Sequence, residues 1–273
     1  MKKFKCLKIF ALAILFGFVG FSQCFAMVES SVGKLLLEIK SEHFKIQYNL
    51  CDEKAVTDIQ KALEDNYGRI TKNLNQGLDD QVTVKIYSDM ETLQKAIKSE
   101  FGYEASKWTT AMFGRGVIML LSPLNPTRED LDYSECVKSA TMGIAAMIVE
   151  KINPEGGILA TGICRYEANL TNRPLKLEHL PSSIEEMFSW DMRNVGAPGE
   201  RAFPCCQSFA GFIVKNYGYG KMIELLKKDY SHNSLGKEIR EIYEKWITKT
   251  KNDLALSESF IHVENVIPNL KLA

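Results

Sequence analysis

The sequence predicts an α+β fold in which a small mixed sheet with its helices is followed by a helical C-terminal subdomain. Apolar and polar residues alternate in 43–48 and again in 82–87, which is the two-residue period of a half-buried strand. Between these segments, apolar residues in 52–74 recur at steps of three and four, as in an amphipathic helix. A strand, a long helix, a strand and further helices in this order predict a sheet packed by helices.

The chain begins with the three parts of a secretory signal peptide. Four lysines lie between Met1 and Lys8, an apolar run covers 9–21, and the sequence Cys24-Phe25-Ala26 provides small residues for cleavage. We expect cleavage after Ala26 and therefore a secreted or extracytoplasmic protein. A retained anchor is the alternative, but the apolar run is short for spanning a bilayer. The mature chain is thus expected to have no membrane span.

Composition limits the classes of partner. Removal of residues 1–26 from the 273 leaves 247, enough for one larger domain or two closely packed subdomains. This segment carries 30 basic and 34 acidic residues, a net charge of about −4, and no basic stripe, so nucleic acid is not an expected partner. An odd number of cysteines in an exported protein predicts at least one free thiol or an intermolecular bond. The five cysteines beyond residue 26 are Cys51, Cys136, Cys164, Cys205 and Cys206.

The first half of the mature chain is expected to build the sheet. Residues 27–42 are interpreted as a linker that leads into it. After the strand over 82–87, Ser88-Asp89 can cap a helix over 90–101. Residues 109–123 then read as a hairpin whose turn is Gly114-Arg115-Gly116.

A pair of apolar helices forms the centre of the sequence. The first begins near Cys136 and is apolar nearly all round, which predicts that it is buried. The break Pro154-Glu155-Gly156-Gly157 separates it from a second helix over 158–168. Arg165 and Glu167 of this second helix are expected on a solvated face, and a role in gripping a ligand is the alternative.

Two segments of this helix pair carry a resemblance to a known family. Residues 137–143 read V-K-S-A-T-M-G and residues 159–166 read L-A-T-G-I-C-R-Y. They resemble V-x-H-E-x-x-H and L-x-E-G-x-A-x-Y of the bacterial peptidase MA-like domains, which are gluzincin metallopeptidases. In the intact motif two His and the downstream Glu bind zinc, and the Glu beside the first His activates the metal-bound water. Those four positions are here Ser139, Ala140, Gly143 and Thr161.

Two further segments extend the resemblance. Residues 43–48 read H-F-K-I-Q-Y and resemble the H-F-x-I-x-Y strand with which these domains begin, so His43 is expected to start a strand and not to bind zinc. A helix over 204–218 resembles another family segment through Gln207-Ser208 and Tyr217-Gly218, with Cys205 where the family has Tyr. The resemblance implies a zincin-like fold. Its parts are the signal peptide 1–26, the linker 27–42, a domain over 43–253 made of a sheet-rich lobe 43–123 and a helical lobe 124–253, and a strand or loose tail over 254–273.

The resemblance also implies a function. None of the four motif positions carries a normal zinc ligand, and no two His lie within five residues of each other. We therefore expect a catalytically inactive pseudopeptidase, without metal or cofactor, that binds a peptide or protein at the cell surface in the vestigial site. In active relatives the edge strand pairs with an extended peptide, so the hairpin over 109–123 is a candidate for strand addition. The alternative is that this hairpin is simply the last strand of the sheet.

The cysteines support a rival interpretation. Cys136 and Cys164 each lie three residues from a vacated ligand position on the same helical face, and Cys205 or Cys206 can reach in from the third helix. Such a cluster would bind a thiophilic metal or form a disulfide, which makes an enzyme with a Cys-based metal or thiol site the first alternative function. Buried cysteines that merely fill space are the preferred interpretation. An unrelated structural or interaction module is the second alternative.

Overall fold

The computed structural model describes residues 37–125, 132–171, 174–192, 198–228, 230 and 235–266. Within them the chain forms an α+β fold around one five-stranded mixed sheet, which confirms the predicted fold class at this level. In their order across the sheet, the strands are β1 (Leu37–Lys40), β2 (Phe44–Tyr48), β3 (Val82–Tyr87), β5 (Val117–Leu121) and β4 (Ala111–Gly114).

The sheet has a parallel centre and two antiparallel edges. Strands β2, β3 and β5 run parallel, whereas β1 and β4 pair antiparallel at the two ends of the strand order. The β4–β5 hairpin pairs Ala111 with Leu120 and Gly114 with Val117, as predicted. Its two turn residues, Arg115 at φ 53° and Gly116 at φ 76°, both have positive φ, which is the requirement of a type I′ hairpin turn.

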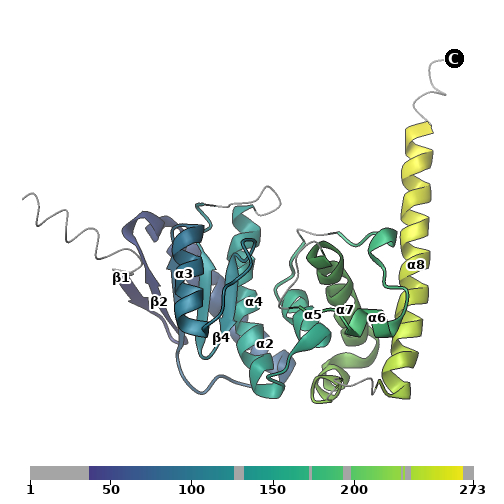
Figure 1. Cartoon of the computed structure of the whole chain (residues 1–273), viewed down its shortest axis with the longest axis horizontal. Helices are drawn as coiled ribbons and strands as arrows, with labels where there is room; N and C mark the ends of the chain where they lie inside the picture. The colour runs from purple at the N-terminus through teal and green to yellow at the C-terminus, as the bar shows by residue number, and fades with distance from the viewer. Residues whose placement is uncertain are drawn as a thin grey trace, which may run out of the picture.

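Three long helices cover the two faces of the sheet: α2 (Glu53–Leu74), α3 (Met90–Phe101) and α4 (Tyr133–Ile152). Side chains alternate along each strand, so Val84 and Ile118 join the apolar cluster of α2 and α4, whereas Tyr87 and Met119 join that of α3. Figure 1 shows the sheet with α3 on one side and the α2 and α4 layer on the other. Helix α4 is therefore central, as its apolar sequence predicts.

The helices beyond α4 form the second half of the molecule. They are α5 (Gly157–Glu167), α6 (Ile184–Phe188), α7 (Pro198–Leu226) and α8 (Lys237–Val266). A short 3-10 turn, η2 (Leu177–His179), lies between α5 and α6, and another, η1 (Leu50–Asp52), precedes α2. In Figure 1, α8 stands at the end farthest from the sheet, and its C-terminal part projects beyond the other helices. No described helix is both long and apolar enough to serve as a membrane span.

Two contacts hold this half together. A Cβ atom on Gly162 would lie 2.2 Å from the carbonyl oxygen of Cys206, so α5 and α7 approach closely because position 162 has no side chain. On α8, Trp246 is buried against Phe209 with ring centroids 5.1 Å apart, and its Nε1 donates to Ser208 Oγ at 3.1 Å. Helix α7 thus connects α5 to α8.

The structure departs from the sequence interpretation at both ends of the described chain. Residues 37–40, assigned to the linker, form β1, because Leu37 pairs with Tyr48 and Lys40 with Lys45. Residues 254–266, expected as a strand or loose tail, continue α8. Neither Gly nor Pro occurs between residue 237 and Pro268, so nothing in the sequence ends this helix earlier. The predicted signal peptide and residues 267–273 lie outside the described residues.

Candidate functional site

The motif positions on α4 are occupied by packing and by a helix-internal hydrogen bond. A Cβ atom on Gly143 would lie 2.8 Å from Ile118 Cδ1, so this position faces the sheet at contact distance. Ala140 is fully buried, and Ser139 Oγ donates to the carbonyl oxygen of Glu135 at 3.0 Å. Positions 140 and 143 are therefore taken up by packing and position 139 by a bond within α4, so the three present no donor set for an ion.

Thr161, the fourth motif position, is half-buried on α5 next to Gly162. Helices α4 and α5 pack against each other, so the two parts of the motif lie on neighbouring helices, as the resemblance implies. Across the described part of the chain, no group of three or more His, Cys, Asp and Glu is arranged to hold a metal ion. Cys136, Cys164, Cys205 and Cys206 therefore form no such group among these residues.

The four buried cysteines are free thiols, and burial raises the pKa of each. Burial, with the nearby charges of Asp132 and Glu135, raises the pKa of Cys136 to about 11. Burial and the neighbouring Cys206 raise the pKa of Cys164 as well. Burial raises the pKa of Cys205 to about 12, and its Sγ donates to the carbonyl oxygen of His179 at 3.1 Å. Because the thiolate is the nucleophile and the metal ligand, these protonated thiols do not favour a Cys-based enzyme.

The charged residues expected on a solvated face of α5 are instead buried. Arg165 is 7% exposed, and its guanidinium lies over the ring of Phe203, 4.9 Å from the centroid. Glu167 is 2% exposed and accepts hydrogen bonds from Arg69, Asn73 and Tyr219. The expectation was wrong because Arg165 packs on Phe203 of α7, and Glu167 is hydrogen-bonded to side chains of α2 and α7 in place of water.

A cavity lined by both polar and apolar side chains opens beside Glu167. It has a volume of about 790 Å³, and its walls come from α2, α4, the C-terminal end of α5 and α7. None of the motif positions or candidate cysteines lines it, since α4 contributes Val137, Lys138 and Thr141, but Glu167, whose alternative role was to grip a ligand, does. The sequence carried one signal for it: Asn66, Arg69 and Asn73 form a polar stripe on one face of α2. That stripe is indistinguishable, in sequence, from an ordinary solvated face.

The free edge of the sheet is the second candidate surface. Leu121 N donates to Thr110 O at 2.8 Å, so the hydrogen-bonded pairs of the hairpin are those of residues 110, 112 and 114. In an antiparallel ladder the intervening residues direct their backbone groups to the other side. The N–H and C=O groups of Ala111 and Phe113 therefore point away from β5, beyond the last strand of the sheet.

Two exposed aromatic side chains precede this edge strand. Tyr103 is 48% exposed and Trp108 is 51% exposed, both in the segment that connects α3 to β4. The hydroxyl of Tyr103 lies 3.3 Å from the sulfur of Met112, which places Tyr103 beside β4. Large aromatic side chains at the surface are typical anchors of protein interfaces.

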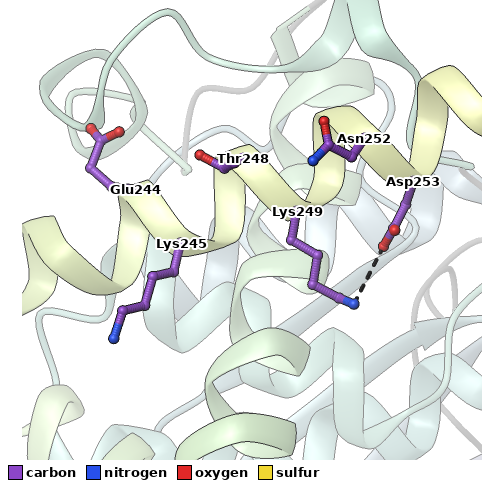
Figure 2. Close-up of a pocket in the computed structure, with 6 residues that line it drawn as sticks. All are labelled: Glu244, Lys245, Thr248, Lys249, Asn252 and Asp253. Carbon is purple, nitrogen blue, oxygen red and sulfur yellow. Dashed lines mark ion pairs between the residues drawn. The ribbon is translucent and has the colours of Figure 1, made fainter.

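A hollow along α8 is not a site of the same kind. Its described lining consists of six residues of one helix: Glu244, Lys245, Thr248, Lys249, Asn252 and Asp253. Figure 2 shows these side chains leaving α8 in two directions, with Lys249 paired to Asp253 at 3.7 Å. Because they do not converge, they offer no common position for a ligand.

The sequence matches no known family model, and no curated protein or solved structure matches it either.

Proposed function

We propose that this protein is an exported, non-catalytic peptide-binding protein built on a degenerate zincin-like scaffold of the peptidase MA-like kind. Its ligand is an extended segment of a peptide or protein that adds a strand to β4. One observation carries the proposal: β4 ends the sheet, and the backbone groups of Ala111 and Phe113 are directed outward from it.

The topology supports the zincin-like part of the proposal. An antiparallel edge strand lies next to a parallel centre, and α4, which carries Ser139 to Gly143, packs on that edge strand and on β5. The helix that carries Thr161 follows directly and packs on α4. This is the relation between edge strand and motif helices that the resemblance to gluzincins implies.

The chemistry supports binding over catalysis. The motif side chains are Ser, Ala, Gly and Thr, of which Ala140 and Gly143 are buried and have no polar side-chain atom. The two outward-facing residues of β4 provide up to four backbone hydrogen bonds, each worth about 0.5–1.5 kcal/mol net. Tyr103 and Trp108 add aromatic contact area beside the strand.

Selection from a random peptide library, with the purified chain as bait, tests the proposal. We expect enrichment of peptides that alternate apolar and polar residues. The best peptide should lose at least tenfold in affinity towards an Ala111→Pro variant, because proline removes an edge N–H and is tolerated on edge strands. Methylation of alternate peptide nitrogens should abolish binding to the unmodified protein.

A matched variant separates the edge from the aromatic contacts. Trp108→Ala should weaken binding but leave its sensitivity to peptide N-methylation unchanged, since the backbone pairing remains. The proposal would have to be given up if no peptide is enriched, or if Ala111→Pro binds the enriched peptide as tightly as the unmodified chain.

A further inference from the structure

The cavity beside Glu167 is separate from the proposed peptide site, because α4 lies between them. Gly143 of α4 contacts Ile118 on the sheet side, whereas Lys138 and Thr141 line the cavity on the other side of the helix. The inference below concerns this cavity alone and does not depend on the proposed peptide binding.

Cations outnumber acids in the walls of the cavity. The lining contains Arg69, Lys138 and Lys215 but a single acidic residue, Glu167. Lys138 also pairs with Glu135 at 2.7 Å. Lys215 is exposed on α7, and no ion pair to another described residue engages its ammonium group. Arg69 is paired with Glu167 and Lys138 with Glu135, so the excess positive charge of the wall is that of Lys215.

The carboxylate of Glu167, the one acidic group in the lining, already has hydrogen-bond donors from the protein. Glu167 forms an ion pair with Arg69, and its carboxylate accepts from Tyr219 at 2.6 Å and from Asn73 at 3.2 and 3.3 Å. Arg69 additionally donates to the carbonyl oxygen of Glu167 at 2.7 Å. Since its negative charge is neutralised within the protein, Glu167 does not repel an incoming anion strongly.

The same network holds the cavity wall in one arrangement. Asn66 Oδ1 accepts from Arg69 Nε at 3.3 Å and from Nη2 at 2.8 Å, so the guanidinium is fixed from two sides although its side chain is 43% exposed. Asn73 Nδ2 also donates to the hydroxyl of Tyr219 at 2.9 Å. Groups that are positioned before binding lose little conformational entropy when a ligand arrives.

We infer that this cavity binds a small hydroxylated organic anion, with Lys215 and Lys138 as partners of its carboxylate or phosphate group. The remaining polar lining, which includes Asn73, Thr141 and Tyr166, matches the hydroxyl groups of a sugar acid or sugar phosphate. At about 790 Å³ the cavity lies within the range of small-molecule sites. The charged and amide side chains in its lining offer hydrogen-bond partners for such a ligand.

Isothermal titration of the full chain against a panel of hexuronates, hexose phosphates, neutral hexoses and inorganic phosphate tests this inference. At least one sugar acid or sugar phosphate should bind, the matching neutral hexose should not, and affinity should fall as salt is added. Lys215→Gln and Lys138→Gln should each weaken binding by about tenfold. Lys249→Gln, which neutralises a lysine of α8 outside the cavity, is the matched control and should change nothing.

Four results would overturn the inference. The first three are no binding by any anion of the panel, equal binding of the neutral hexose, and an equal loss in Lys249→Gln. The fourth is inorganic phosphate that binds as tightly as the sugar phosphate, which would overturn the assignment of a hydroxylated ligand. Unfolding midpoints of the three variants establish that each is folded, and Lys215→Gln alters only an exposed side chain.

Discussion

Replacement of Gly162 by alanine tests whether the contact between α5 and α7 determines stability. The added Cβ would lie 2.2 Å from the oxygen and 2.8 Å from the carbon of the Cys206 carbonyl, and 3.1 Å from Ala210 Cβ. The first of these distances is 1.2 Å short of the 3.4 Å at which ordinary contact begins. Because the obstacle is backbone, no side-chain rotation relieves it, and the two helices must move apart.

The expected magnitude follows from two opposing effects. Overpacking of this kind destabilises by about 1–3 kcal/mol. Alanine is a better helix former than glycine by roughly 0.5–1 kcal/mol, which offsets only part of the loss. Gly68→Ala is the matched control, because it makes the same substitution within α2 where a Cβ meets nothing within 4 Å. That variant should be stabilised by about 0.5–1 kcal/mol.

Urea unfolding followed by circular dichroism measures both changes as differences in the free energy of unfolding. We expect the two variants to shift the midpoint in opposite directions. A Gly162→Ala protein as stable as Gly68→Ala would refute the close approach of α5 to the Cys206 carbonyl.

Two further predictions concern titration and thiol chemistry. Burial alone would raise the pKa of Glu135, but hydrogen bonds from Lys138 and Thr171 lower this pKa below 4.5. The ionised Glu135 therefore stabilises the fold above pH 4.5, and this contribution is lost as the pH falls through the lowered pKa. Glu135→Gln should therefore be less stable than the unmodified chain at neutral pH and show a smaller stability loss on acidification, and an unchanged pH profile would argue against this role. Cys51 is exposed while the other four described cysteines are buried, so a thiol reagent should modify Cys51 alone in folded protein that lacks residues 1–26. Rapid modification in a Cys51→Ser variant would contradict the burial of the others.

Local patterns in the sequence predicted most of the sheet lobe. The helix over 90–101 is confirmed with its bounds, and Asp89 caps it by accepting from Thr92 N at 2.8 Å. The hairpin turn was predictable because consecutive residues with positive φ require a glycine-containing turn sequence. Strand β1 was not, because four residues that alternate weakly become a strand only through their pairing with β2.

The cavity could not be found from sequence for a different reason. Its polar network joins Glu167 to Tyr219, 52 positions later, and to Arg69, 98 positions earlier. Each of these residues has the helical position of an ordinary surface residue. Only the tertiary fold, in which α5 packs on α7 and the end of α5 reaches Arg69 and Asn73 of α2, brings them together and removes Glu167 from water. The motif positions were easier to locate, since their spacing along α4 and α5 is a local property.

The strand order has a consequence for the sequence of events during folding. All strand pairs are complete once the chain reaches Leu121, but α4, which shares one face of the sheet with α2, begins only at Tyr133. A chain emerging N-terminus first can thus pair its strands while apolar side chains such as Ile118 still lack α4 above them. Until α4 packs on the sheet, the nascent chain exposes apolar surface that is prone to association with other chains. The docking of α4 removes this surface from water.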